Sequence, residues 1–414
     1  MKSIATLIAA GSLLAALANA QTPRYTVTDL GTFGGNFSVA FGINNAGRVG
    51  GTAALPNGNA YAFLTGIAKT DLGTLGGPNS QAGGPNGAGQ LPILSETSTP
   101  DPLKEDFCGF GDHLTCLGAL WNGVMTALPT LGGNNAMAAA LNNRGQVIGV
   151  AENSTIDKLC PSPQVLDYEA VVWGPAPGQI QGLPPLPGDT VGFALGINDL
   201  GQVVGSSGTC ANTVVTAVGL FVGPHAVLWE NGAVTDLGNL GGKTMGKAGA
   251  INSRGEVAGF SDVPDGSVHS FLWTKDAGMQ DLGALGADVL GDPAGINNST
   301  QVVGGSCDDS GNCRGFLWQN KVLSDLNDLI PADSPLYLMY GLGINDAGEI
   351  VGFALQNSTG EVHAYLATPV RGKASGESAT PAAHVETSPK SLPENVRQML
   401  RQRLPFGRFG AGPR

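Results

Sequence analysis

Charged residues are scarce in this sequence, at 13% of the 414 positions, and aromatic residues account for only 6%. Glycine is abundant instead, with 64 copies. A glycine inside a helix costs about 1 kcal/mol relative to alanine, so this composition disfavours long helices. It favours many short strands joined by tight turns.

Motifs of common hydrolases are also missing. No serine occupies a Gly-x-Ser-x-Gly elbow, and no His-Glu-x-x-His pair is present. Three of the five histidines, His225, His269 and His363, occupy the same place in a repeated unit described below. A residue that recurs at one repeat position is typical of a structural contact. The sequence therefore predicts no catalytic residues and a protein that is not an enzyme.

Basic residues are few, since 21 Lys and Arg stand against 33 Asp and Glu and give a net charge of −12. Residues 371–414 hold eight of these basic residues and only three acidic ones, so the preceding part of the chain is more acidic still. An acidic surface repels phosphate groups, which removes the attraction that dominates binding to nucleic acids. We expect no nucleic-acid partner.

Long apolar runs are confined to the start of the chain. Lys2 precedes the apolar segment 4–17, and residues 18–20 have the small-x-small form of a signal peptidase site. The segment is too short for a typical membrane span, although a membrane anchor is the alternative interpretation. We expect a signal peptide at 1–20, no integral membrane span, and a secreted, extracellular or periplasmic protein.

A unit of roughly fifty residues repeats along 21–370. Its clearest phrase is Gly-Ile-Asn-x-x-Gly followed by a short valine-rich run, and Asn-x-x-Gly is a hairpin turn signal. Seven copies are present, and the most degraded, the second along the chain, keeps only the turn spacing. The turn asparagines are Asn44, Asn86, Asn142, Asn198, Asn252, Asn297 and Asn345.

Each copy predicts four strands, A to D. Strand A precedes the asparagine, B follows it, C is an apolar run that often ends in tryptophan, and D contains Asp-Leu-Gly-x-Leu-Gly-Gly or a looser version. The recurrent tryptophans are interpreted as packing between copies, with sugar stacking as the alternative. The second copy departs most from the pattern, so we expect it to form the least regular sheet.

The chain ends support a closed ring. Residues 25–30 form a D strand with no A, B and C before it, and the last copy has A, B and C without D. The first strand would complete the last blade and remove open edges. The sequence predicts an all-β, seven-bladed β-propeller over 21–370, closed by 25–30. A β-solenoid or another β-repeat fold is the alternative.

These phrases, in this fixed order, resemble the HAF-type extracellular repeat family across nearly all of 25–370. The resemblance implies export and a propeller-like repeat. It brings no established activity and no catalytic residues.

Six cysteines form an even set, and in an exported protein they are expected to pair as disulfides. All six fall near the predicted B–C loops. Of the fifteen pairings, we predict two within single loops and one between neighbouring blades. The predicted disulfides are Cys108–Cys116, Cys160–Cys210 and Cys307–Cys313.

The B–C and D–A loops share one face of a propeller, and this face carries the longest insertions, at 95–118, 152–169 and 206–224. Binding sites usually lie on such loops. Carboxylates gather there, and the pair Asp308 and Asp309 could present oxygens to calcium, although solvated side chains are the alternative. No acid pair for glycoside hydrolysis can be singled out. The carboxylates assigned to this face are Asp101, Glu105, Asp106, Asp112, Asp262, Asp265, Asp308 and Asp309.

The tail 371–414 is predicted to be a disordered segment rich in proline, serine and alanine, with a short basic amphipathic helix at 392–404. This helix could dock on the acidic body or contact an anionic membrane or a partner. A terminus that is simply disordered is the interpretation we favour.

The sequence as a whole predicts an exported, non-enzymatic binding or scaffold protein that uses the loop face for a protein or glycan ligand, with no cofactor apart from the calcium considered above. A lectin-like or carbohydrate-active propeller is the alternative. Assembly into a cell-surface matrix is a third.

Overall fold

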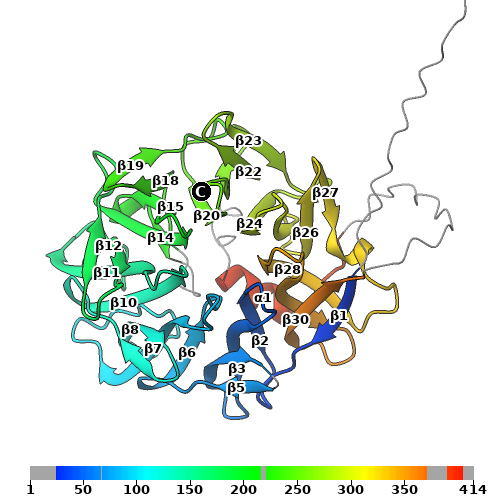
Figure 1. The fold of residues 1–414 in the computed structure, drawn as a ribbon, viewed down its shortest axis with the longest axis horizontal. Helices are drawn as coiled ribbons and strands as arrows, with labels where there is room; N and C mark the ends of the chain where they lie inside the picture. Colours follow the sequence, from blue (N-terminus) through cyan, green and yellow to red (C-terminus); the bar gives the residue numbers. More distant parts are fainter. Residues whose placement is uncertain (1–24, 67, 216–220, 371–388, 404–414) are drawn as a thin grey trace, which may run out of the picture.

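The computed structural model describes residues 25–66, 68–215, 221–370 and 389–403. The predicted signal peptide and residues 371–388 and 404–414 of the predicted tail lie outside this part of the chain. The regular secondary structure of the described residues is almost entirely β-strand, with one α-helix, α1 (Glu394–Arg403), and two short 3-10 helices, η1 (Cys210–Asn212) and η2 (Leu326–Leu329). The strands form a β-propeller arrangement around a central axis (Figure 1).

Five sheets are separate and four-stranded. The first three are β2 (Ser38–Ile43), β3 (Val49–Ala54), β4 (Ala60–Thr65), β5 (Lys69–Asp71); β6 (Gly76–Ala82), β7 (Leu91–Pro100), β8 (Leu114–Trp121), β9 (Met125–Ala127); and β10 (Gly132–Leu141), β11 (Val147–Ile156), β12 (Leu166–Trp173), β13 (Ile180–Leu183). The other two are β14 (Val191–Ile197), β15 (Val203–Gly208), β18 (His225–Glu230), β19 (Ala233–Asp236); and β28 (Leu336–Ile344), β29 (Ile350–Gln356), β30 (Val362–Pro369), β1 (Tyr25–Asp29).

The number of separate blades differs from the predicted seven. The strands of the fifth and sixth copies belong to one eight-stranded sheet, because Val268 pairs in parallel with Leu290 at the point where the two copies meet. The prediction of seven separate blades was therefore wrong, and each sheet remains open. The eight strands are β20 (Gly246–Ile251), β21 (Val257–Asp262), β22 (Val268–Thr274), β23 (Gly278–Gly283), β24 (Leu290–Ile296), β25 (Val302–Cys307), β26 (Cys313–Gln319) and β27 (Val322–Asp325).

The first described strand pairs with the last copy of the repeat. β1 lies antiparallel to β30, with Tyr25 opposite Pro369 and Asp29 opposite Tyr365. This is the pairing predicted for residues 25–30. The second copy, expected to be the least regular, also forms a four-stranded sheet in the order β6-β7-β8-β9.

The turn asparagines form a closed ring of hydrogen bonds. In each copy the side-chain oxygen accepts from the backbone N–H groups two and four residues further along, as Asn44 Oδ1 does from Ala46 and Arg48. The side-chain Nδ2 of each asparagine donates to the backbone oxygen of the next one, at 2.9–3.2 Å. The last of these bonds, from Asn345 to Asn44, returns to the first copy.

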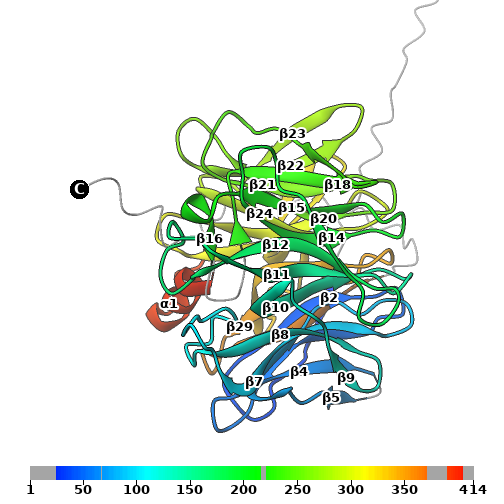
Figure 2. The same ribbon diagram turned by 90° about the vertical axis from the view of Figure 1, so that its left-hand side faces the viewer.

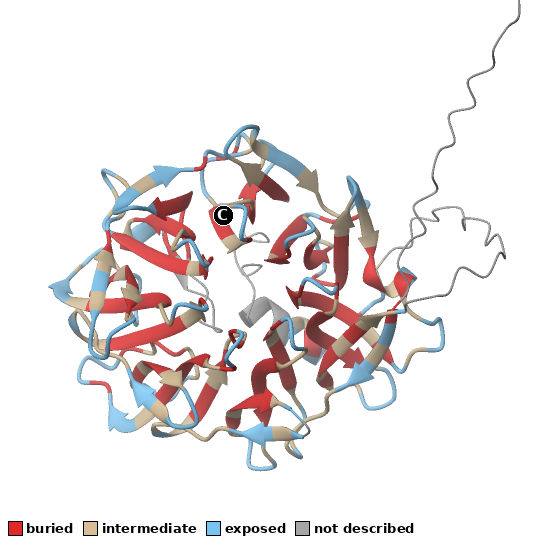
Figure 3. Ribbon diagram, viewed as in Figure 1, coloured by how far each residue is buried: buried red, intermediate tan, exposed pale blue. Residues whose placement is uncertain are grey.

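The core lies between sheets, where inner and middle strands pack face to face (Figure 3). Small residues let the strands approach closely: a Cβ on Gly51 would lie 2.1 Å from the backbone oxygen of Val39. Trp173 and Trp229 are buried. Their indole N–H groups donate to the backbone oxygens of Pro129 and Pro184, and each proline lies in the loop that connects the preceding sheet to the tryptophan's own sheet. These two tryptophans therefore fix the loops that connect neighbouring sheets.

The two faces of the disc differ. Figure 2 shows α1 and the short strand β16 (Val214–Val215), which pairs with β17 (Phe221–Val222), on the same face. β16 follows the Cys210 insertion, so this is the face predicted to carry the elaborated loops. The opposite face carries the short asparagine turns.

Candidate functional site

The innermost strands surround a central cavity of about 400 Å³. Every copy of the repeat contributes residues to its wall. Three positions before each turn asparagine the residue is apolar, and all seven residues at this position line the cavity: Phe41, Gly83, Ala139, Leu195, Gly249, Ala294 and Leu342. We call this cavity the central channel.

A second repeat position, five residues before the asparagine, makes the channel asymmetric. Six residues at this position line the cavity: Gln81, Met137, Phe193, Lys247, Asp292 and Tyr340. Two neighbouring copies carry opposite charges there, while Met137 and Phe193 are apolar. Polar chemistry is therefore concentrated on one side of the channel.

Lys247, Asp292 and Tyr340 form one buried polar group. Lys247 Nζ lies 2.5 Å from Asp292 Oδ1, and the Tyr340 hydroxyl donates to Asp292 Oδ2 at 2.9 Å. The ammonium also lies 4.7 Å from the centre of the Phe260 ring. All three polar residues are at most 4% exposed, and burial together with the Asp292 charge raises the pKa of Tyr340. The hydroxyl therefore stays protonated and holds the carboxylate in place.

The sequence prediction missed these three residues. Their signal was present, since a lysine and an aspartate interrupt strand A of the fifth and sixth copies, where the fourth has Phe193. This signal is a departure of two copies from the repeat and not a feature that the copies share.

The channel wall also presents backbone groups. Six of the seven strands that line it, β2, β6, β10, β14, β20 and β28, are terminal strands of the sheets in which they lie. A terminal strand has a second row of N–H and C=O groups without a strand partner. The wall therefore combines apolar side chains, strand edges and one polar group.

Helix α1 lies near the central axis of the ring (Figure 1) and on its loop face (Figure 2). Leu392 and Val396 are each 2% exposed and belong to an apolar cluster against which Phe41 and Leu342 of the channel also pack. The Leu392 backbone N–H donates to Asn312 Oδ1 at 2.9 Å. Residues 389–403 thus pack against the body of the chain.

Buried acids lie on the loop face between the second and third copies. Glu105 and Glu152 are fully buried, and both accept from Gln164 Nε2. Burial and the neighbouring Glu105 charge raise the pKa of Glu152 to about 8, and burial also raises the pKa of Glu105. Asp101 joins them through Asn135, whose side-chain amide donates to Asp101 and Glu152. Of the predicted carboxylates, only Asp101 and Glu105 belong to this group.

Most other predicted carboxylates hold loops in place. Asp262 accepts from the backbone N–H groups of Lys243, Thr244 and Met245. Asp106 accepts from Gly111, and Asp265 from Ser267. Asp112 accepts from the side chain of Asn79, which also contacts Glu96.

The two residues considered for calcium lie in a hairpin turn. Both oxygens of Asp308 accept from Asn312, one from its backbone and one from its side chain. Asp309 Oδ1 accepts from Ser310 Oγ. The turn is thus held together by its own amide and hydroxyl groups.

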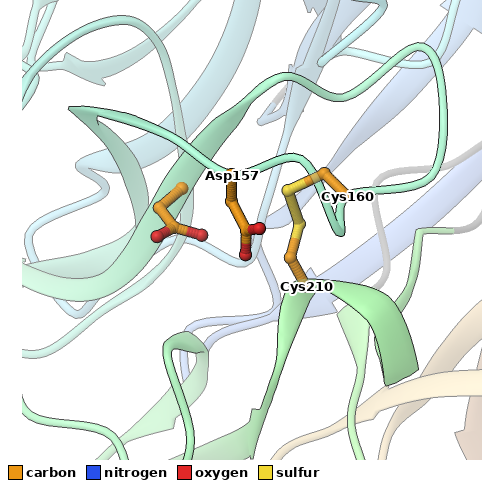
Figure 4. Close-up of side chains that lie close together, drawn as sticks. Asp157, Cys160 and Cys210 are labelled. Atoms are coloured by element: carbon orange, nitrogen blue, oxygen red, sulfur yellow. A yellow bond between two sulfur atoms is a disulfide. The ribbon is translucent and has the colours of Figure 1, made fainter.

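The three predicted disulfides are confirmed. Cys108 bonds to Cys116, Cys160 to Cys210 and Cys307 to Cys313. The second of these joins neighbouring sheets, and two carboxylates lie beside it: ligand atoms of Asp157, Asp167 and the two cysteines are all within 4.8 Å of one another (Figure 4). Sequence reasoning missed both aspartates.

Each repeated histidine lies beside an aspartate of strand D. His363 Nδ1 is 2.8 Å from Asp29, His269 is 2.9 Å from Asp281, and His225 is 3.6 Å from Asp236. The same aspartates accept from a glycine N–H two residues on, as Asp29 does from Gly31. These pairs therefore link strand C to the turn that follows strand D.

Comparisons with known proteins give fold likenesses only. A scan against family models finds no match, and neither does a search of curated proteins. Among solved structures, the chain is similar to a Mycobacterium tuberculosis puromycin-hydrolyzing peptidase (13% identity, TM-score 0.45, 83% of this chain, 56% of that one) and a Pyrococcus horikoshii acylaminoacyl peptidase (12%, 0.45, 82%, 52%). It is also similar to TolB from Acinetobacter baumannii (11%, 0.41, 79%, 64%). The chain spans about half the length of these peptidases.

These findings contradict the function predicted from the sequence. A non-enzymatic binding or scaffold protein, with a lectin-like or carbohydrate-active alternative, was expected, and the similar structures are mostly peptidases. Within the described ranges, no helix combines the length and apolar character that a membrane crossing needs. The three disulfides agree with an extracellular or periplasmic location.

Proposed function

We propose that this propeller binds peptides and acts together with an activity that processes them. Its central channel would bind an extended, uncharged, apolar segment of polypeptide. The proposal concerns recognition of the peptide and assigns no catalytic residue. The observation that carries it is the buried Lys247–Asp292 pair in the wall of a mostly apolar channel.

This pair matches a peptide group. An ammonium has three N–H donors, of which Asp292 takes one, and each carboxylate oxygen can accept more than one bond. The pair is neutral overall, so it offers a donor and an acceptor to a neutral amide without adding net charge. A charged ligand would leave an uncompensated buried charge, which is costly.

The rest of the wall supports the same ligand class. Strand edges bind extended peptides through main-chain hydrogen bonds, while the positions of alternate side chains give specificity. Phe41, Leu195 and Leu342 offer apolar contacts for those side chains. The cavity volume lies within the usual range of about 300–1,000 Å³ for ligand pockets.

We also propose that the chain is an exported member of the HAF-type repeat family. The repeated phrases and the disulfides support export.

Calorimetric titration with end-blocked tripeptides tests the peptide proposal. We expect an apolar peptide to bind the full chain, and the same peptide with a central aspartate to bind at least about tenfold more weakly, a loss of roughly 1.4 kcal/mol. Lys247→Met/Asp292→Leu removes both charges and should lose the preference between the two peptides. Lys243→Met, which removes an exposed lysine, is the matched control. The proposal is overturned if no apolar peptide binds or if the double variant keeps the preference.

A further inference from the structure

Four side chains from two sheets meet at the Cys160–Cys210 disulfide. Asp157 follows β11 and Asp167 lies in β12, so they are diagonal neighbours on one hairpin. Cys160 lies in the loop of that hairpin, and Cys210 begins η1 after the next sheet's β15. All four ligand atoms lie within 4.8 Å of one another (Figure 4).

The carboxylate of Asp167 is buried, and one of its oxygens has no hydrogen-bond partner among the described residues. Asp167 is 8% exposed, and no hydrogen-bond donor reaches its Oδ1 among the described residues. The Asp157 carboxylate lies beside it, and Asp157 Oδ1 accepts only a backbone N–H, from Leu159, among the bonds found in this loop. Two acids are therefore held together beside the disulfide, and one of their oxygens is buried and unpaired among the described residues.

The disulfide beside them is the most accessible of the three. Cys160 is half-buried, whereas Cys108, Cys116, Cys307 and Cys313 are at most 2% exposed. A reductant can therefore reach this bond first. With the sulfurs oxidised, they offer no thiolate, and only the two carboxylates remain as strong ligands.

We infer that reduction of Cys160–Cys210 creates a zinc site formed by the two thiolates and the carboxylates of Asp157 and Asp167. An exchange with a dithiol balances the step: the dithiol is oxidised to its disulfide, and its two hydrogens pass to Cys160 and Cys210. Zinc binding then releases the two thiol protons, because the thiolate is the ligand.

The donor set fits zinc. Zn²⁺ takes four ligands in a tetrahedron, with sulfur at about 2.3 Å and carboxylate oxygen at about 2.0–2.2 Å. With these bond lengths, ligand atoms of a tetrahedral ion lie about 3.3–3.8 Å apart. The four ligand atoms here lie within 4.8 Å of one another, so small side-chain movements after reduction would bring them to that geometry. The metal would join the same two sheets that the disulfide joins, so the link between them would persist in both redox states.

Zinc binding to the full chain, before and after treatment with a phosphine reductant, tests this inference. The phosphine and one water become the phosphine oxide while the disulfide gains two hydrogens. We expect tight binding of a single Zn²⁺ only after reduction, measured by competition with a chromophoric chelator. With Co²⁺ as the probe, thiolate-to-metal charge-transfer bands should appear.

Three variants separate this site from general effects of reduction. Cys160→Ser/Cys210→Ser should abolish the binding, and Cys307→Ser/Cys313→Ser should leave it unchanged. Asp157→Asn/Asp167→Asn keeps the disulfide, and thus a folded oxidised state, but should weaken zinc binding after reduction by about tenfold or more. Equal zinc binding by oxidised and reduced protein overturns the inference, as does binding that survives in the Cys160→Ser/Cys210→Ser variant or is unchanged in the aspartate variant.

Discussion

Asn345 donates from its side-chain Nδ2 to the backbone oxygen of Asn44 at 3.0 Å, across 301 positions of sequence. The bond joins the last copy of the repeat to the first. The same contact joins each of the remaining pairs of neighbouring copies. The first and last copies of the repeat therefore meet in the same way as any two consecutive copies.

Replacing Asn345 with Asp tests this bond. The variant keeps the oxygen that accepts from the backbone of Ala347 and Glu349. It loses the donor to the Asn44 oxygen and to the Glu349 carboxylate, and it places a second carboxylate beside Glu349. We expect the free energy of unfolding to fall by about 1–3 kcal/mol, because a buried acceptor loses its donor and a charge enters a buried site. Urea denaturation measures it. Asn357→Asp, at an exposed loop position, is the control, and equal stability of the two variants would contradict the assignment.

The long disulfide should stabilise the fold more than the short ones. Loop-closure entropy gives about 4 kcal/mol for the Cys160–Cys210 link and about 2.4 kcal/mol for Cys307–Cys313. The corresponding double serine variants, compared by chemical denaturation in the absence of added metal, should differ in that order. The reverse order would show that native-state contacts outweigh chain entropy.

The buried acid pair should make stability depend on pH. Burial raises the pKa of Glu152 from 4.5 to about 8, so the folded protein binds this proton more tightly than the unfolded chain. The free energy of unfolding is therefore highest below pH 4.5 with respect to this group, and falls as pH rises towards 8, by up to about 1.4 kcal/mol per pH unit. Glu152→Gln should remove most of the decrease in the free energy of unfolding between pH 4.5 and 8. Glu230→Gln, at an exposed position, should leave that decrease unchanged. If the Glu152→Gln variant keeps the same dependence of the free energy of unfolding on pH, another group is responsible for it.

The polar group of the channel should be sensitive to the loss of one partner. Lys247→Met leaves the Asp292 charge buried and should cost about 3–5 kcal/mol. Lys247→Met/Asp292→Leu should recover part of that stability, since buried ion pairs and apolar substitutes are often equivalent. The buried Tyr340 hydroxyl loses its acceptor in this variant, which retains a cost of about 1–3 kcal/mol. Thermal unfolding of the single and double variants measures this. If the double variant is less stable than the single one, the two charges do not compensate each other.

The docked C-terminal segment should be released by one substitution. Leu392→Asp places a charge in its apolar cluster, so the roughly 1.5–3 kcal/mol of a buried leucine is lost. Hydrogen exchange should then become fast in 389–403 and stay slow in the strands. Ser391→Asp, at the exposed neighbouring position, should leave exchange unchanged. Slow exchange in the Leu392 variant would contradict the docking.

The features that could be predicted from the sequence are mainly those that recur in each copy of the repeat. The asparagine turns, the pairing of 25–30 with the last copy and the three disulfides follow from residues that recur or from loops that bring cysteines close. Even the degraded turn at Asn86 could be placed, because its Oδ1 needs only backbone N–H groups of Ala88 and Gln90. Such local contacts are encoded within a few residues.

Contacts between unlike residues were missed. Lys247 and Asp292 are 45 positions apart, and their pairing depends on two strands that meet only in the assembled ring. The joining of two copies through Val268 and Leu290 depends on how closely two sheets approach. An amphipathic pattern predicted the helix at 392–404, but nothing in it named Asn312 or the apolar cluster as its partners. The distances between these side chains and between the two sheets are fixed only in the folded ring and cannot be derived from the sequence alone.

The antiparallel pairing of β1 with β30 also determines how the ring responds to tension. Tyr25 and Pro369 lie opposite each other at the same end of the two strands. A pull on the chain from these two residues would load the inter-strand bonds one after another, from that end inwards, rather than all at once. The seam would then open like a zipper at low force. Under a stretching load, therefore, the closing strand pair would yield before strands that are loaded in shear.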